Sequence, residues 1–223
     1  MSNSFISMFD VIGPVMVGPS SSHTSGAATI AWMARQIFTG NPEKVTFTLY
    51  GSFAETHLGH GTDRALIGGM LGYKSDDVRI RNAYEHAEEA GMQVEFIVDK
   101  ETAVSHPNTV DIVMTEADHT LLIRGESVGG GRVRIKRMNN IDVDFTGEYS
   151  TIIISHLDRM GTVAFITTFM ADHDINIATL KLFREEKGKK AVTVIETDDY
   201  ISEELKEMYL KHKYITSVDL IEI

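Results

Sequence analysis

The sequence predicts an α+β protein built from two domains, and three observations support this class. The chain has 223 residues, a length that suits one large domain or two small ones. Residues 1–147 show a few helix patterns and then a run of strand patterns, an order typical of α+β domains rather than doubly wound sheets. Residues 148–223 follow the order β-α-β-β-α-β of a ferredoxin-like sandwich.

The spacing of apolar residues predicts the elements of the first domain, because a period near 3.6 indicates a helix and alternation indicates a strand. Gly40 and Pro42 end the first helix, and Ser75 with Asp76 and Asp77 resembles the cap and acidic first turn of the third. In order, the patterns predict a helix at 27–38, a strand at 45–50, helices at 63–70 and 75–90, and strands at 93–98, 109–114, 120–123, 132–136 and 141–145.

The second domain has two predicted helices, one ending near Asp172 and one capped by Ser202. Its predicted strands lie at 151–155, 175–183, 191–196 and 217–221, with a charged turn at 184–190. The two helices would cover one face of the sheet. The sheet edges would then stay available for pairing with a second copy of the chain.

Composition excludes several classes of function. The chain carries 21 Lys and Arg against 32 Asp and Glu, a net charge of −11, so it has no general basic field for nucleic acid. It contains no cysteine, which excludes disulfides, a thiolate nucleophile and any iron–sulfur or zinc site held by its own thiolates. No apolar run reaches the roughly 18–20 residues that span a bilayer. The segment Met1 to Val17 lacks the basic start of a signal peptide, so a cytoplasmic location without membrane attachment is expected.

The segment Gly18 to Gly26 reads GPSSSHTSG and stands directly before the first predicted helix. Helix N-termini expose unpaired N–H groups that attract carboxylates, and the hydroxyl groups here add neutral donors. His23 is the one side chain of this segment that exchanges a proton near neutral pH. The composition suits a small carboxylic acid held beside a base. A serine-rich helix cap with a surface histidine is the alternative interpretation.

Other polar segments follow strand patterns. His57, His60 and Asp63 could hold a metal if residues 51–63 were helical, but Gly59 and Gly61 favour a loop. The segment Glu126 to Gly131 (ESVGGG) predicts a tight loop and lacks the lysine of a Walker motif. In the second domain the candidate effector contacts are a turn, residues 157–161, and the polar start of a strand at residues 173–177.

Four segments together resemble one family, the β chain of the bacterial iron–sulfur-dependent L-serine dehydratase. They are, in chain order, GPSSSHT (Gly18–Thr24), HGTDRA (His60–Ala65), SHPNT (Ser105–Thr109) and SVGGG (Ser127–Gly131). The resemblance covers nearly the whole chain. It implies a mixed α/β domain of the allosteric-substrate-binding type at 1–147 and an amino-acid-sensing ACT domain at 148–223. The chain departs from the usual ACT turn, which has proline where Met160 stands.

This resemblance implies a subunit that helps convert L-serine to pyruvate and ammonia. A 4Fe-4S cluster held by a separate, cysteine-bearing α chain would polarise the serine hydroxyl, and His23 would remove the α-proton or relay it. This chain itself would hold no metal. The implied substrate-binding residues are Ser20, Ser21, Ser22, Thr24, His60, Thr62 and Asp63. The implied effector-binding residues are Asp158, Gly161, Asn176 and Ile177, and the ACT region would form a homodimer.

Two alternatives stay open at this point. The chain could be an amino-acid-sensing regulatory subunit without catalytic residues, for which the absence of a cysteine-rich partner would be the sign. It could also be a metal-dependent hydrolase that uses His57, His60 and Asp63, in which case the purified chain would contain zinc or manganese.

Overall fold

The computed structural model describes residues 15–222 of the chain, and these form two units. The first unit comprises residues 15–35 and 40–135. The second comprises residues 36–39 and 136–222. No helix in the described part is long and apolar enough to cross a membrane.

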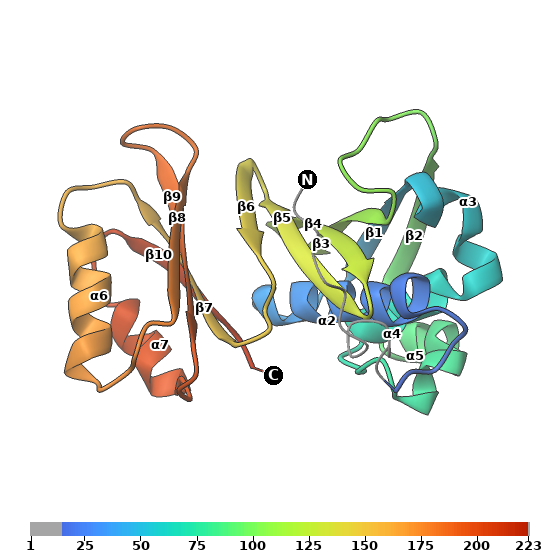
Figure 1. Cartoon of the computed structure of the whole chain (residues 1–223), viewed down its shortest axis with the longest axis horizontal. Helices are drawn as coiled ribbons and strands as arrows, with labels where there is room; N and C mark the ends of the chain where they lie inside the picture. Colours follow the sequence, from blue (N-terminus) through green and yellow to red (C-terminus); the bar gives the residue numbers. More distant parts are fainter. Residues whose placement is uncertain (1–14, 223) are drawn as a thin grey trace, which may run out of the picture. The chain divides into compact units, whose positions relative to one another are not determined.

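A six-stranded mixed sheet of order β2-β1-β3-β4-β5-β6 begins in the first unit (Figure 1). β1 and β2 are parallel, whereas β1 pairs with β3, and β3 with β4, in antiparallel register. The strands are β1 (Lys44–Tyr50), β2 (Gln93–Asp99), β3 (Thr109–Glu116), β4 (His119–Gly129), β5 (Arg132–Met138) and β6 (Ile141–Phe145).

Helices pack against this sheet where small residues allow close approach. A Cβ atom at Gly125 of β4 would lie 3.0 Å from Cγ1 of Ile30, so glycine there lets the first long helix rest directly on the strand. Ile30, Phe47 and Ile112 are fully buried in the core that results. The helices are η1 (Ser21–Ser25, a π-helical turn), α2 (Gly26–Ile37), α3 (Gly51–His60), α4 (Thr62–Met70), η2 (Val78–Asn82, 3-10) and α5 (Ala83–Glu89).

The expectation of a loop over residues 51–63 is wrong. α3 covers Gly51–His60, because its glycines lie where a helix tolerates them. Gly51 (φ +51°) is the first residue of the helix, and Gly61 (φ +66°) ends the helix with a left-handed cap that donates to the His57 carbonyl. Gly59 sits inside the helix without a positive φ.

Three other elements begin or end at residues that differ from the sequence prediction. The helix expected from Ser75 to residue 90 begins as the 3-10 turn η2, capped by the Asp77 side chain, and becomes α-helical only in α5. β4 runs on through Gly129, so most of ESVGGG is strand and the tight turn is confined to its last glycines. The strand expected at 175–183 begins at Thr179, which leaves residues 175–178 irregular.

The second unit has the predicted β-α-β-β-α-β order, and its sheet has the strand order β10-β7-β9-β8, with every pair antiparallel. Both helices cover the same face of this sheet (Figure 1), with Tyr209 donating from the buried core to the Ile166 carbonyl at 2.8 Å. Ser202 caps the second helix, as predicted. The elements are β7 (Ser150–Leu157), α6 (Thr162–Asp172), β8 (Thr179–Arg184), β9 (Lys190–Thr197), α7 (Glu203–Tyr209) and β10 (Ile215–Ile221).

Candidate functional site

The serine-rich segment forms a capped turn that holds His23 at the start of α2. The Ser20 hydroxyl accepts a hydrogen bond from the His23 backbone N–H at 3.1 Å and lies 3.4 Å from His23 Nδ1. The turn itself, η1, is π-helical, a rare geometry that occurs often at functional sites. His23 is partly exposed, so its imidazole is accessible from outside the core.

The His23 ring meets residues from α3. Its Nε2 atom lies 2.8 Å from the Ser52 hydroxyl, and its ring centroid is 4.9 Å from that of His60 and 5.4 Å from that of Phe53. Burial lowers the pKa of His23 below its ordinary value, and the nearby charge of His60 lowers it further. The neutral imidazole, the form that accepts a proton, is therefore favoured near pH 7.

The SHPNT loop contacts α3 at the same place. The Ser52 backbone N–H donates to the Pro107 carbonyl at 2.7 Å. Glycine is required at the preceding position, because a Cβ atom on Gly51 would lie 2.6 Å from the same carbonyl oxygen. Ser52 therefore connects His23 with a loop more than fifty residues further along the chain.

The SVGGG strand contacts the turn from another side. A Cβ atom on Gly26 would overlap the Ser127 hydroxyl, so β4 and the start of α2 are in close contact. The Ser127 N–H donates to the Asn108 carbonyl at 2.9 Å, and the Asn108 amide donates back to the Ser127 carbonyl at 3.3 Å. Ser105 donates to the carboxylate of the buried Glu126. All four segments that carry the family resemblance thus gather around η1.

Several polar atoms in or next to these segments are buried without a hydrogen-bond partner in the described structure. Such an atom costs about 1–3 kcal/mol, and a bound ligand or a partner protein would remove that cost. The atoms are Ser25 Oγ, Asn108 Oδ1, Ser127 Oγ, Thr62 Oγ1 and His57 Nδ1.

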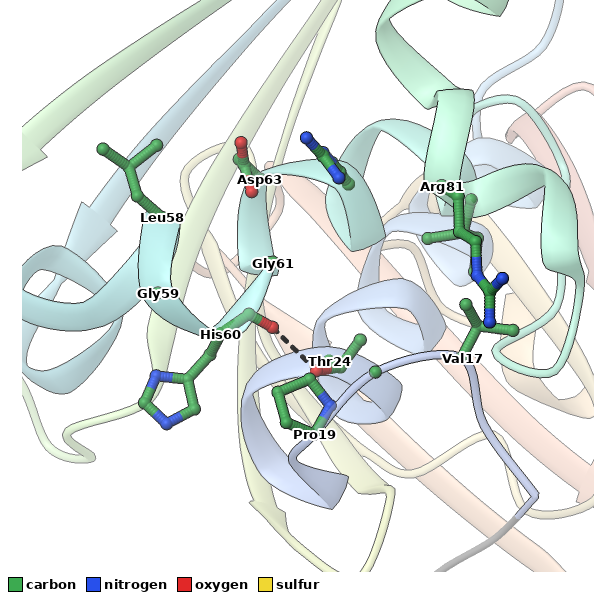
Figure 2. Close-up of a pocket in the computed structure, with 12 residues that line it drawn as sticks. Val17, Pro19, Thr24, Leu58, Gly59, His60, Gly61, Asp63 and Arg81 are labelled. Atoms are coloured by element: carbon green, nitrogen blue, oxygen red, sulfur yellow. Dashed lines mark hydrogen bonds between the residues drawn. The ribbon is translucent and has the colours of Figure 1, made fainter.

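A cavity of about 440 Å³ lies beside the turn, in the size range of small-molecule sites (Figure 2). The Thr24 hydroxyl donates to the His60 carbonyl at 2.9 Å and holds η1 against the end of α3 there. His23 does not line the cavity, although His60, its ring neighbour, does. The lining residues are Val17, Gly18, Pro19, Thr24, Leu58, Gly59, His60, Gly61, Asp63, Arg64, Ile80 and Arg81.

The charges in this cavity are of both signs. Asp63 is buried and accepts a hydrogen bond from the Tyr84 hydroxyl at 2.9 Å, which raises the pKa of Tyr84 together with burial. Arg64 and Arg81 line the cavity without an ion pair among the described residues. A cavity lined by two guanidinium groups attracts carboxylates, in a chain that is otherwise acidic.

A metal site at His57, His60 and Asp63 does not form. Within residues 15–222, no three acidic or histidine side chains are arranged to hold a metal ion. Asp63 faces Tyr84, and the His60 ring lies against His23. The metal-dependent hydrolase is therefore not supported.

Comparison with known proteins identifies the family of the chain. Residues 5–120 match the family described as serine dehydratase beta chain, which is more than half of the chain. The chain is 41% identical over 206 residues to the probable L-serine dehydratase beta chain of Bacillus subtilis, covering 91% of this chain and 93% of that protein. It is 38% identical over 221 residues to the L-serine dehydratase beta chain of Peptoniphilus asaccharolyticus, covering 97% and 98%.

The chain belongs to the serine dehydratase beta chain family. It is a subunit of an L-serine dehydratase, and membership of a beta-chain family implies an α-chain partner. The chain is also 26% identical over 199 residues to D-3-phosphoglycerate dehydrogenase of Bacillus subtilis, covering 88% of this chain and 37% of that protein.

The expected effector residues of this beta chain do not meet within one copy. Asp158, at the end of β7, accepts from the Gly188 N–H at 2.9 Å, just before β9 begins, and this bond lowers its pKa. Gly161 (φ +89°) follows as the N-cap of α6. Asn176 instead donates its N–H to Asp199 at 2.8 Å, beyond the other end of β9. Asp158 and Gly161 therefore lie at one end of β9, and Asn176 and Ile177 at the other. Because a strand rises about 3.3 Å per residue, the length of β9 separates the two pairs by roughly 25 Å. Ile177 is in the second pair and packs on the core.

The sequence analysis missed three residues of this candidate site. Arg64 and Arg81 carry charge into the cavity, and Ser52 contacts the His23 ring. Arg64 was visible inside HGTDRA, and Ser52 follows a glycine at the end of a predicted strand. Arg81 had no signal, because its position in the cavity depends on how η2 packs.

Proposed function

We propose that this chain supplies the base and part of the substrate-binding surface of an L-serine dehydratase whose 4Fe-4S cluster is carried by a cysteine-bearing α chain. One observation carries the proposal: the four family segments converge on His23, a partly exposed imidazole whose pKa is lowered. The reaction converts L-serine to pyruvate and ammonia.

The residues of this chain do not fit the cluster. Iron–sulfur clusters are held mainly by thiolates, and the chain has no cysteine. The described residues also offer no group of histidines and carboxylates for a metal ion. We assign the cluster, and with it the activation of the serine hydroxyl, to the α chain.

His23 serves as the base for the α-proton of L-serine. A base with a pKa below about 6.5 is mostly unprotonated near pH 7, and a positioned general base contributes roughly 10²–10⁴-fold to the rate. Loss of the α-proton and of the hydroxyl as water leaves 2-aminoacrylate. This enamine tautomerises to an imine and hydrolyses to pyruvate and ammonia without further help from the protein.

The remaining residues bind substrate or support those that do. Ser21 and Ser22 are partly exposed, and their hydroxyls have no partner in the described structure, so they are free for the substrate carboxylate. Ser20 and Thr24 hold the turn through their hydrogen bonds. Asp63 and His60 line the neighbouring cavity, and Thr62, which lies between them in the sequence, is buried. Arg64 and Arg81 draw the anionic end of L-serine toward this side of the subunit.

The test is His23→Ala in the enzyme reconstituted with its α chain, assayed anaerobically for pyruvate release from L-serine. We expect kcat to fall at least 100-fold while the visible absorbance of the cluster stays unchanged. His119→Ala, an exposed histidine at the start of β4, is the matched control. Unchanged turnover of His23→Ala would assign the chain to the regulatory alternative.

We also propose that residues 148–223 act as an ACT domain that binds an amino acid between two copies. Identical edge strands paired about a two-fold axis run antiparallel, so opposite ends of the two sheets become neighbours. This places Asp158 and Gly161 of one copy beside Asn176 and Ile177 of the other. The separation of these residues within one chain supports a dimeric effector site.

A further inference from the structure

Both ring nitrogens of His23 face serine hydroxyls, and the two contacts differ. Ser20 Oγ lies 3.4 Å from Nδ1 and already accepts the His23 backbone N–H. Ser52 Oγ lies 2.8 Å from Nε2, a full-strength hydrogen bond between residues 29 positions apart. The Ser20 oxygen can accept a second N–H from the ring, since a hydroxyl has two lone pairs.

A serine hydroxyl both donates and accepts, so the two contacts fit either tautomer of the neutral ring. The tautomer suited to a base that acts through Nε2 is the following one. Nδ1 carries the hydrogen and donates to Ser20, and the Ser52 hydroxyl donates to the lone pair of Nε2. Nε2 is then the basic atom of His23. Without Ser52, only the weaker Ser20 contact and the packing against Phe53 and His60 would define the ring's orientation.

Ser52 is itself held firmly. Its N–H donates to the Pro107 carbonyl at 2.7 Å, and it stands at the start of α3, directly after the left-handed Gly51. A serine whose backbone is held by a helix start and by a second loop presents its hydroxyl to the imidazole from a defined position. A freely rotating surface serine would not.

We propose that Ser52 is the positioning residue of His23: its hydroxyl selects the tautomer with a proton-free Nε2 and aims that atom at the substrate. This rests on the proposed role of His23 as the base. When L-serine binds, the Ser52 side chain rotates about its Cα–Cβ bond, and the α-C–H of the substrate takes the place of the hydroxyl at Nε2. The C–H bond then breaks, its proton moves to Nε2, and the electron pair remains with the substrate.

The first experiment needs no activity. Nitrogen-15 NMR of the isolated full chain, above the pKa of His23 and assigned with His23→Gln, reports which ring nitrogen carries the proton. We expect the Nδ1–H tautomer in the wild type and in Ser52→Thr, and a mixture or the Nε2–H form in Ser52→Ala. Thr56→Val is the control, because it removes a hydroxyl from the next turn of α3 that bonds to the Ser52 carbonyl and not to the ring.

The second experiment measures kcat and KM for L-serine in the reconstituted enzyme. Misorientation of a base lowers the rate of proton transfer more than it lowers binding, so Ser52→Ala should lose about 10- to 100-fold in kcat with KM within threefold. Ser52→Thr should retain most of kcat. If Ser52→Ala does not fold, Ser52→Val against Ser52→Thr gives the same comparison at nearly equal side-chain shape.

The outcomes separate the two proposals. A wild-type tautomer in Ser52→Ala, or a kcat within twofold of wild type, overturns the role of Ser52 even if His23→Ala is inactive. A changed tautomer together with full activity of His23→Ala overturns the role of His23 as the base, and the role of Ser52 in catalysis with it.

Discussion

At the residue scale, the pKa of His23 depends on the residues packed around it more than on the residues next to it in the sequence. Burial lowers its pKa first, and the proximity of the His60 ring adds to that effect. The charge of His60 disfavours a positive charge on His23. A change at His60 therefore alters the pH range in which His23 accepts a proton.

Replacing His60 with Gln should move the acidic limb of the kcat/KM profile to higher pH. The pKa of His23 rises toward its ordinary value when the neighbouring charge is gone, so the base becomes protonated earlier on acidification. The measurement is kcat/KM between pH 5 and 8 in the reconstituted enzyme, with His57→Gln as the control. A limb that stays in place or moves to lower pH would contradict the assignment.

Asp219 in β10 shows the opposite case, a carboxyl that favours its proton. It is 5% exposed, and burial raises its pKa to about 6, although hydrogen bonds from Ser217 and Thr39 act against that rise. A folded pKa above the unfolded value of 3.8 means that this group's contribution to stability is lost as pH rises through about 6.

We therefore expect Asp219→Asn to increase the free energy of unfolding, and to do so by about 1 kcal/mol more at pH 7 than at pH 5. Urea unfolding of the full chain at the two pH values measures this difference. Asp118→Asn, at an exposed position, serves as the control. An equal gain at both pH values would mean that Asp219 does not titrate in this range.

At the scale of elements, glycines decide which segments can touch. Gly26 lets Ser127 of β4 reach the start of α2, and Gly51 lets the Pro107 carbonyl reach α3. Gly59 lies within α3 and has open space around its Cβ direction. Gly26 and Gly51 thus allow elements to come into contact, whereas Gly59 is simply tolerated inside a helix.

Gly26→Ala should destabilise the chain by about 1–3 kcal/mol, since a Cβ atom would overlap the Ser127 hydroxyl and lie 2.7 Å from its Cβ. Gly59→Ala should be neutral or stabilise by up to about 1 kcal/mol, because alanine favours a helix interior. Thermal or urea unfolding of both variants makes the comparison. Equal effects of the two substitutions would show that the contact between α2 and β4 is loose.

At the scale of the whole molecule, the chain is one part of a larger assembly. Its family implies an α chain, and within residues 15–222 its candidate site has buried polar atoms without hydrogen-bond partners. The second unit presents a four-stranded sheet whose outer strands are β10 and β8.

The isolated chain, which has no thiolates, should not release pyruvate from L-serine. Activity of the pure chain without iron would contradict the proposed division of roles between the two subunits.

The isolated chain should also be a dimer, held by paired edges of the second unit. Light scattering or sedimentation at micromolar concentration should give about twice the chain mass of 24.8 kDa. Removing residues 148–223 should abolish dimerisation if the ACT region carries it. A monomeric chain at that concentration would contradict the proposed effector site, because the effector residues would then stay apart.

Local patterns determined the elements. The period of apolar residues predicted α2, α4 and the complete order of the second unit, and Ser202 was recognised as a helix cap, because each depends on neighbours a few residues away. The four family segments were also sufficient to indicate the family, and the lack of cysteine was sufficient to exclude a cluster held by thiolates of this chain.

Only the tertiary structure decided how these parts combine. It showed that residues 51–60 are helical, that Ser52 bonds to His23, and that Asp158 and Asn176 stand at opposite ends of β9. The physical reason is range: helix and strand propensity act over a few residues, whereas these contacts join segments tens of residues apart. Packing of the sheet and its helices selects such contacts, and no local pattern encodes them.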